Sequence, residues 1–268
     1  MPASALINVM TQAVRKAGRS LTRDFGEVEN LQVSIKGPAN FVSAADMRAE
    51  EILYSELERA RPAYSFLMEE SGEVDGADKT HRWIIDPLDG TTNFLHGIPM
   101  FCISVGLERD GELVAGVIFN PISDELYTAE KGKGAFVNDR RLRVAGRRSL
   151  ADCVFACGIP HRGRPRHDRF LREAETMMRE SAGLRRTGSA ALDLAFVAAG
   201  RFDGYWEHAI KPWDMAAGIV LVREAGGFAS DFQGRTGAQA LFEDATVVAA
   251  NPTIHKDLLK TLQNSATA

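Results

Sequence analysis

The sequence predicts a mixed α/β protein in which helices pack on largely antiparallel sheet. Three observations support this fold class. Residues 5–21 place apolar side chains at helical spacing, residues 101–137 form successive β-like segments joined by tight turns, and the second half alternates short apolar strands with helices. With 268 residues, the chain is long enough for one large domain or two closely packed ones, and for a sizeable core.

The first half is predicted to begin with two helices and to continue as sheet. After the helix at 5–21, β-like runs in residues 31–42 surround a turn at Lys36-Gly37-Pro38. A second helix begins at Ser43, where Asp46 completes a pattern typical of a capping box. The strands expected next are 65–68, 82–86 (ended by Pro87), 101–107, 113–119, 124–129 and 134–137.

The second half is predicted to mix both kinds of element. Ser189 opens a helix that Gly200 ends, and Pro212 lies in the first turn of the next helix, which Gly226-Gly227 ends. The remaining expected helices are 169–180 and 254–262. The expected strands are 152–156, 184–187, 203–208 and 246–250.

Composition excludes several classes of protein. Hydrophobic residues make up 45% and charged residues 25% of the chain, as in ordinary globular proteins. The net charge is −4 (32 Lys and Arg against 36 Asp and Glu), so the chain lacks a general attraction to polyphosphate and no direct nucleic-acid ligand is expected. No stretch approaches the roughly 18 apolar residues that cross a bilayer, and polar residues interrupt any signal-peptide core, so we expect a cytoplasmic protein without a membrane partner.

The three cysteines do not predict a disulfide framework, because they are few and odd in number. Cys153 and Cys157 lie in one apolar run, and a zinc site would need more Cys or His residues nearby. We therefore interpret both as small buried apolar side chains.

Five carboxylates are expected at the ends of secondary-structure elements: Glu69, Glu70, Asp86, Asp89 and Asp214. The densest segment is residues 86–92, where a strand ends in an acid, turns at Pro and Gly, and meets two threonine hydroxyls. A short helix expected after the turn would point its free N–H groups into the same space. Oxygen ligands without Cys or His suit a hard cation, above all Mg²⁺.

Such acids would repel one another, by roughly 4 kcal/mol for a pair about 4 Å apart at an effective dielectric constant near 20. Bound cations or raised pKa values must relieve this repulsion. A cation-rich pocket beside helix N–H groups can bind phosphate, and two cations could activate an attacking water. Asp46 and Asp214 could instead be ordinary helix-start acids, and both alternatives stay open. Turn chemistry explains one Asp before Gly but not the second acid that ends a buried strand, Asp86.

These segments resemble the inositol monophosphatase family. The resemblance rests on Asp86-Pro-Leu-Asp-Gly-Thr-Thr-Asn93 and Trp213-Asp-Met-Ala-Ala-Gly218, with Glu69-Glu70-Ser71 upstream, and extends from Lys36 to about Gly227. Haloacid dehalogenase-type phosphatases carry their two acids two positions apart, whereas Asp86 and Asp89 are three apart, which favours direct attack by water. The implied fold is a layered αβαβα sandwich of the sugar-phosphatase type with mostly antiparallel mixed sheets. It forms a single domain over residues 1–268, with 1–150 and 151–268 as candidate sub-lobes.

The resemblance implies a set of metal ligands. Glu69, Asp86 and the Leu88 carbonyl would hold one Mg²⁺, and Asp86, Asp89 and Asp214 would hold a second. A third, weaker Mg²⁺ would lie near Glu69, bound mostly through water.

The resemblance also implies catalytic and substrate-binding roles. Glu70 and Thr91 match positions that orient the nucleophilic water, and Asp46 would accept a hydrogen bond from Thr91. The N–H groups of Gly90 and Thr91 would bind the phosphate. The positions that match those around the sugar or inositol ring are Asp89, Ala190, Glu207 and Asp214.

Some features lie outside this pattern. Met68 stands where relatives usually have Gly, and its side chain could alter the backbone beside Glu69 and the third metal site. The basic segment 159–166 could reach over the pocket, but we interpret it as a solvated loop. We interpret His96 and His208 as polar packing residues and not as metal ligands, since oxygen ligands are abundant.

The resemblance implies a Mg²⁺-dependent, lithium-sensitive phosphomonoesterase that hydrolyses inositol monophosphate (myo-inositol 1-phosphate). A histidinol-phosphate phosphatase, or another sugar or nucleotide phosphatase of the same superfamily, is the alternative. A different class of function is also open, because bacterial members include the extragenic suppressor protein, which is linked to the transcription machinery. The expected partners are therefore a small phosphate ester, a second copy of the chain in a homodimer, and RNA polymerase as an added partner.

Overall fold

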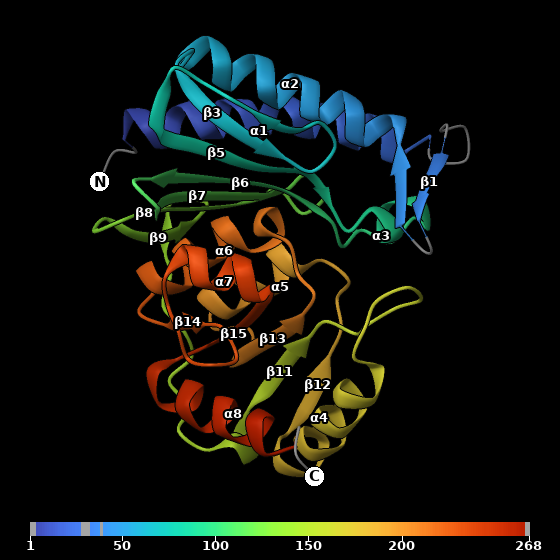
Figure 1. Ribbon diagram of the computed structural model, residues 1–268, viewed down its shortest axis with the longest axis vertical. Helices are drawn as coiled ribbons and strands as arrows, with labels where there is room; N and C mark the ends of the chain where they lie inside the picture. The colour runs from blue at the N-terminus through green and yellow to red at the C-terminus, as the bar shows by residue number, and fades with distance from the viewer. Residues whose placement is uncertain (1–3, 28–32, 38–39, 266–268) are drawn as a thin grey trace.

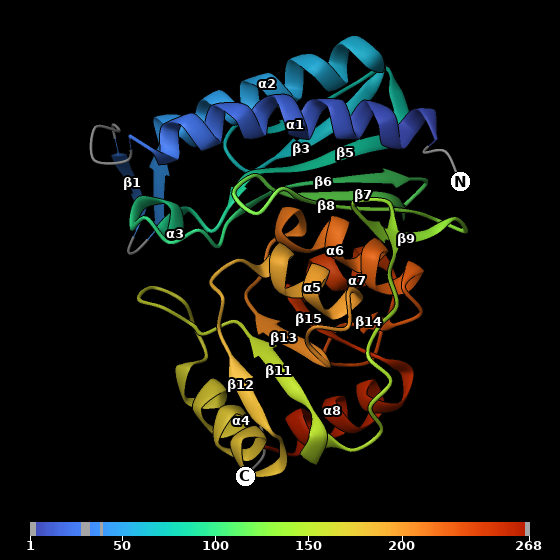
Figure 2. The same cartoon turned by 180° about the vertical axis from the view of Figure 1, so that it is seen from behind.

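The computed structural model describes residues 4–27, 33–37 and 40–265. Its layers follow the order helix, sheet, helix, sheet, helix, as the two opposite views show (Figures 1 and 2). The predicted αβαβα sandwich is therefore confirmed. The helices are α1 (Ala5–Phe25), α2 (Ala44–Ala60), α3 (Thr91–Leu95), α4 (His167–Glu180), α5 (Ala190–Ala198), α6 (Pro212–Glu224), α7 (Ala238–Asp244) and α8 (Pro252–Ser265), with a short 3-10 helix at Leu150–Asp152.

The first sheet lies under α1 and α2. Its strands are β3 (Tyr64–Met68), β4 (Gly72–Val74), β5 (Asp78–Asp89), β6 (Cys102–Arg109), β7 (Glu112–Asn120), β8 (Glu125–Glu130), β9 (Gly134–Val137) and β10 (Arg140–Arg141). The spatial order is β10-β9-β8-β7-β6-β5-β3-β4, and neighbours are antiparallel except for the pair β3–β5. Because β3 and β5 are parallel, their carboxyl ends lie at the same edge of the sheet. Glu69, which follows β3, therefore lies near Asp86 and Asp89 at the end of β5.

The second sheet lies between the middle helices, α5 and α6, and the outer helices, α4 and α8 (Figure 1). Its strands are β11 (Val154–Cys157), β12 (Gly183–Arg185), β13 (Gly204–His208), β14 (Phe228–Ser230) and β15 (Thr246–Ala250). The order is β12-β11-β13-β15-β14, with β11 parallel to both of its neighbours and the other pairs antiparallel. A separate antiparallel hairpin joins β1 (Val33–Gly37) and β2 (Asn40–Ser43). Pro38, part of the predicted turn there, lies outside the described residues.

Most predicted elements are confirmed to within a few residues, and the last strand matches at 246–250. The prediction that Pro87 ends its strand is wrong, because β5 continues to Asp89. Pro87 lies where the pairing register with β6 shifts, and a proline is tolerated there because its missing N–H is not needed for the ladder. The predicted strand 184–187 ends earlier, at Arg185. The sequence reading missed β4, β10, β14 and α7, which are all short.

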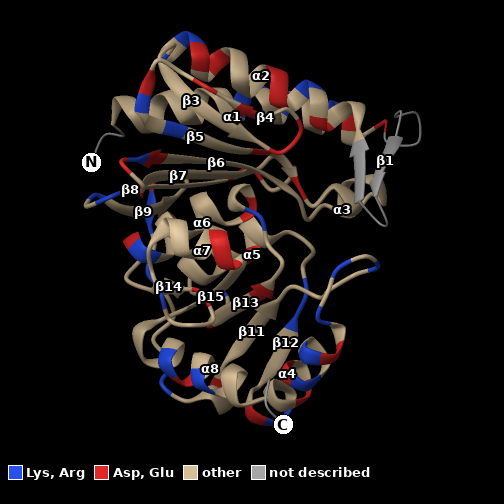
Figure 3. Ribbon diagram, viewed as in Figure 1, with Lys and Arg blue, Asp and Glu red and all other residues tan. Residues whose placement is uncertain are grey.

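The first two helices begin at residues whose side chains cap them. Ser4 precedes α1 and its hydroxyl accepts the N–H of Ile7 at 3.1 Å. Ser43 and Asp46 form the predicted capping box of α2. Charged residues are concentrated on the outer helices, whereas most residues of the strands between the layers are uncharged (Figure 3). Of the helices described, none combines the length and apolar character needed to span a membrane.

Small residues let α6 lie directly on the first sheet. A Cβ atom placed on Gly116 of β7 would lie 2.5 Å from the carbonyl oxygen of Ala217, and one on Gly106 of β6 would lie 2.9 Å from the Cβ of Ala216. The Ser104 hydroxyl of β6 also donates to the carbonyl of Trp213 at 3.2 Å. These close contacts fix the beginning of α6, and with it Asp214, against the sheet edge where β5 ends.

We expect Gly116→Ala to lower the free energy of unfolding by about 2–3 kcal/mol, because α6 must move away to accommodate the new methyl group. Gly146→Ala is the matched control, since its Cβ would meet no atom within 4 Å. Urea denaturation of both variants measures the effect. Equal stability of the two variants would contradict the close packing described here.

Candidate active site

A cavity of about 160 Å³ lies at the edge where β3 and β5 end. Its walls come from both sheets and from the first residues of α3, α5 and α6. The residues that line it are Glu69, Asp86, Leu88, Asp89, Gly90, Thr91, Thr92, Cys157, Gly158, Ile159, His161, Arg164, Arg186, Gly188, Ser189, Ala190, Asp193, Glu207 and Asp214.

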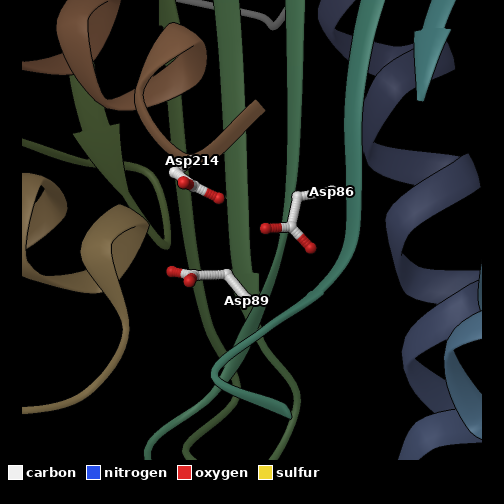
Figure 4. A group of neighbouring side chains, drawn as sticks. All are labelled: Asp86, Asp89 and Asp214. Atoms are coloured by element: carbon white, nitrogen blue, oxygen red, sulfur yellow. The ribbon is translucent and has the colours of Figure 1, made fainter. Parts of the chain in front are cut away.

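Three carboxylates converge at one end of this cavity. Asp86 and Asp89 of β5 and Asp214 of α6 each offer an oxygen atom, and these atoms lie within 4.8 Å of one another (Figure 4). Residues three apart on a regular strand point to opposite faces. Here Asp86 pairs with Ser104 and Asp89 with Cys102, so β5 contains one more residue than β6 between these pairs. This irregularity brings both side chains to the same side of the sheet.

Burial and mutual repulsion make these carboxylates hard to ionise. Burial is the largest cause that raises the pKa of Asp86, followed by repulsion from Glu69, Asp89 and Asp214. Burial likewise raises the pKa of Asp214, and the charges of Asp89 and Glu69 add to the effect. Divalent cations would relieve this repulsion. Because the donors are all oxygen atoms, the cluster suits a hard cation.

Hydrogen bonds to Asp89 join β5 of the first sheet to the start of α5. The Asp89 Oδ2 accepts hydrogen bonds from the Ser189 hydroxyl at 2.6 Å and from the Ala191 N–H at 2.7 Å, both at the start of α5. The Cys102 thiol lies 3.8 Å from the same oxygen. The Asp214 carboxylate accepts a hydrogen bond from the Lys211 N–H at 2.8 Å. Asp214 therefore caps the start of α6 and also belongs to the carboxylate cluster.

Thr91 is held by two acceptors. Its hydroxyl oxygen lies 3.2 Å from Asp46 Oδ1 and 3.1 Å from the Leu88 carbonyl, and the hydroxyl proton can serve one of them at a time. Asp46 is fully buried and its Oδ2 accepts the Ser43 N–H at 2.9 Å. Asp46 therefore caps α2 and binds Thr91, so both interpretations of this residue fit the structure. Gly90 has φ +100, and a Cβ there would lie 2.9 Å from the Met100 carbonyl, so this turn requires glycine.

Glu50 is a buried carboxylate that the sequence reading missed. It lies one turn after Asp46 on α2 and is only 3% exposed. Its two oxygens accept the Glu70 N–H at 2.9 Å and the Ser71 hydroxyl at 2.5 Å. Asp46 and Glu50, one turn apart on α2, thus hold two segments of the site. Asp46 holds the segment with Thr91, and Glu50 holds the segment that follows Glu69. The signal in the sequence was the spacing of four residues between two acids on an otherwise apolar helix face.

The opposite end of the cavity is built on the second sheet. Glu207 of β13 is enclosed by Tyr205, whose hydroxyl donates to it, and by Gly158, where a Cβ would lie 1.9 Å from the Glu207 carboxyl carbon. Burial raises the pKa of Glu207 to about 7. Ala190 lines the cavity beside it. The sequence reading did not identify Arg186 and Asp193, which also line this end.

The structure places the remaining predicted residues as follows. Glu69, Leu88, Gly90 and Thr91 line the cavity, whereas Glu70 and Asp46 lie behind its wall. The interpretation of residues 159–166 as a solvated loop is wrong for Ile159, His161 and Arg164, which line the cavity. All three cysteines are free and buried, which confirms the interpretation of Cys153 and Cys157 as buried side chains.

Comparison with known proteins agrees with this geometry. Residues 3–267 match the model of the inositol monophosphatase family. The chain belongs to this family. It is 60% identical over 268 residues to the inositol-1-monophosphatase of Mesorhizobium japonicum, which covers all of both chains, and 40% identical over 262 residues to the Nus factor SuhB of Pseudomonas aeruginosa, which covers 96% of each.

Solved structures of family members have the same fold. The extragenic suppressor protein suhB from Bartonella henselae aligns with a TM-score of 0.94 at 58% identity, over 97% of this chain and 99% of that chain. The Thermotoga maritima inositol monophosphatase aligns with a TM-score of 0.88 at 33% identity, over 98% and 99%. The family is metal-dependent, and the cluster of Asp86, Asp89 and Asp214 could bind metal ions.

The histidines are not part of this cluster. His208 Nε2 lies 2.9 Å from a carboxylate oxygen of Glu173, behind the wall that carries Glu207, and His96 is exposed. Neither lies among the acids that could hold a metal in the described part of the chain.

Glu207→Gln should stabilise the metal-free protein at pH 8. The pKa of Glu207 is about 7 in the folded protein against 4.5 in the unfolded chain, so the folded state holds the proton more tightly. Its stability therefore falls as pH rises through this window, by about 3 kcal/mol at most, and glutamine removes this loss. We expect the gain in urea denaturation at pH 8 and none at pH 4.5.

Glu125→Gln provides a control of opposite sign, because Arg201 lowers the pKa of Glu125 and the ionised form stabilises the fold. This variant should be less stable than the wild type at pH 8. A Glu207→Gln protein no more stable than the wild type at pH 8 would show that burial does not disfavour the Glu207 charge.

Glu50→Ala should lower kcat on inositol 1-phosphate at least tenfold, because the Glu70 N–H and the Ser71 hydroxyl lose their acceptors and the Glu69 segment is no longer held. Glu50→Gln should retain most activity, since its amide oxygen can accept one of these bonds and its NH₂ can donate to the hydroxyl. Glu51→Ala, an exposed neighbour on α2, is the control. A loss of stability in Glu50→Ala with unchanged kcat would contradict a positioning role.

Proposed function

We propose that this protein is a Mg²⁺-dependent phosphomonoesterase that hydrolyses inositol monophosphate, with myo-inositol 1-phosphate as its substrate. The observation that carries the proposal is the convergence of Asp86, Asp89 and Asp214 beside Thr91, in a cavity whose other end holds Glu207. The inositol-1-monophosphatases of Mesorhizobium japonicum and Rhizobium meliloti, each 60% identical over nearly the whole chain, support the substrate.

The proposed metal ligands are those that the family resemblance implies, and the convergence of Asp86, Asp89 and Asp214 supports them. Glu69, Asp86 and the Leu88 carbonyl would hold one Mg²⁺, and Asp86, Asp89 and Asp214 a second. A third, weaker ion would lie near Glu69. Bound cations would supply the positive charge that lowers the pKa of an attacking water and stabilises the departing oxygen.

The chain's own groups would position the reactants. Asp46, through its hydrogen bond, orients the Thr91 hydroxyl so that this oxygen can accept a hydrogen bond from the nucleophilic water. Glu69 also lines the cavity, and Glu70 follows it in the segment that Glu50 anchors. Water held in this way attacks phosphorus directly, without a phosphorylated side chain.

The remaining residues would bind the substrate. The N–H groups of Gly90 and Thr91 begin α3 and have no partner carbonyl within that helix, so they can donate to the phosphate oxygens. The carboxylates of Glu207, Asp89 and Asp214 can accept hydrogen bonds from ring hydroxyls, with Ala190 packed beside the ring.

Asp89→Asn is the direct test of this mechanism. We expect kcat on inositol 1-phosphate to fall by a factor of about 100 or more, because one negative charge leaves the cluster. The fold should remain intact, since the amide oxygen can still accept from Ser189 or Ala191. Near-normal turnover, with an unchanged circular dichroism spectrum, would count against the assignment.

Lithium should inhibit the enzyme when Mg²⁺ is limiting, because a small monovalent cation can occupy an all-oxygen site without supplying the same charge. The measurement is the initial rate on inositol 1-phosphate at millimolar Li⁺, with Na⁺ at equal ionic strength as the control. Activity untouched by Li⁺ would remove this part of the proposal.

Other phosphate esters remain alternatives for the same site. Comparison of kcat/KM for inositol 1-phosphate, histidinol phosphate, fructose 1,6-bisphosphate and adenosine 3′,5′-bisphosphate tests the substrate. A higher kcat/KM for any of the other three esters would replace inositol 1-phosphate.

A second function, association with RNA polymerase, is favoured by the relatives named Nus factor SuhB, which are 39–40% identical over 96–97% of the chain. We propose it as an addition to catalysis. Capture of RNA polymerase by the wild type and by Asp89→Asn tests it, since binding should survive the loss of turnover. Failure of both proteins to capture the polymerase would overturn this addition only.

Three statements about the whole molecule stay predictions. They are a homodimer, a single domain over 1–268 with 1–150 and 151–268 as candidate sub-lobes, and a cytoplasmic location. Light scattering, the coincidence of unfolding transitions followed by different probes, and cell fractionation test them in turn.

A further inference from the structure

The basic segment 159–166 has no part in the reaction described above, yet it reaches the cavity. His161 and Arg164 of this segment line the cavity at the Glu207 end, and Arg186, which follows β12, lines it from the neighbouring strand. Lys and Arg residues are visible on this loop and at the end of β12, on the side that faces the first sheet (Figure 3). The acid cluster lies at the other end of the same cavity.

Arg164 is held in place by neutral partners. Its Nη1 donates to the Ala209 carbonyl at 2.5 Å, and its Nε lies 3.4 Å from His161 Nε2. The next arginine, Arg166, lies 3.3 Å from His208 Nδ1 and ties the segment to the end of β13. Among the residues described, neither Arg164 nor Arg186 forms an ion pair with a carboxylate within 4.0 Å. Both guanidinium groups therefore keep donors for a ligand.

The acids that face these arginines oppose them with less than their full charge. Burial raises the pKa of Glu207 to about 7, against the lowering effect of Arg164 and Arg186, so this carboxyl is partly protonated near neutral pH. Burial also raises the pKa of Asp193. Both arginines keep their charge. The end of the cavity that would receive the alcohol portion of a substrate is therefore positive on balance.

We propose that Arg164 and Arg186 select substrates by the charge of the alcohol portion. The ester of the neutral polyol remains the substrate, and among esters of charged alcohols those that carry a further anionic group are favoured over those that carry an ammonium group. This inference rests on the proposed phosphomonoesterase function and defines its substrate class. A unit charge about 8 Å away at an effective dielectric constant near 20 changes affinity on the order of tenfold.

The test compares three esters that differ in the charge of the alcohol: histidinol phosphate, myo-inositol 1-phosphate and fructose 1,6-bisphosphate. The variants are Arg164→Gln, Arg186→Gln and the double variant. Their controls are Arg162→Gln in the same segment and Arg185→Gln beside Arg186, two exposed arginines that do not line the cavity. We expect the ratio of kcat/KM for the anionic ester over the cationic ester to fall by at least tenfold in each single variant and further in the double variant, since each arginine attracts one ester and repels the other.

Each outcome decides the proposal. An unchanged ratio in the double variant, or the same fall in the controls, overturns it. An equal loss on all three esters also overturns it, because a structural role lowers every rate alike. If the wild type does not hydrolyse inositol 1-phosphate, the proposed function fails on its own. The dissociation constants of the three esters in Mg²⁺, measured by calorimetry for the same variants, then still decide the charge selection.

Discussion

The central physical constraint in this structure is that folding places several carboxylates close together in a buried space. Asp86, Asp89 and Asp214 would each ionise readily in water, and burial raises the pKa of each. For Asp86 and Asp214, repulsion from the neighbouring acids adds to this effect. The rest of the chain must hold these groups against that repulsion. It does so with neutral donors, such as Ser189 and the backbone N–H groups of Ala191 and Lys211, which stabilise negative charge without adding a competing cation.

Backbone irregularity accounts for the arrangement of the acids as much as side-chain chemistry does. The extra residue in β5 between Asp86 and Asp89 turns two side chains to the same side, and Pro87 lies at this point because no ladder hydrogen bond is needed there. The Asp86 carboxylate stabilises the distortion, since it accepts the Leu88 N–H at 2.9 Å. A regular strand with the same residues would separate the two acids by the thickness of the sheet.

The sequence predicts those parts of the molecule whose signals are local. The long helix α1 and the strand β15 follow from strong apolar periodicity and clear ends, and the acids of residues 86–92 are conspicuous because turn chemistry does not explain both. The elements β4, β10 and β14 contain two or three residues, too few for a period to be visible. The register shift in β5 depends on its pairing with β6, and Arg186 and Asp193 reach their places only through tertiary packing. Non-local facts of this kind leave no pattern in a single sequence.

The cavity is divided between the two sheets in a way that affects how such a protein can change. The carboxylate cluster and Thr91 depend on β3, β5 and α2 of the first half, together with the start of α6, whereas Glu207 and the segment after β11 belong to the second sheet. Substitutions in the loop before α4 can therefore change the shape of the Glu207 end of the cavity, while the carboxylate cluster and Thr91 keep their geometry. Evolution can therefore retain hydrolysis and change the alcohol portion of the substrate, because the residues for hydrolysis and those that contact the alcohol lie mainly on different sheets.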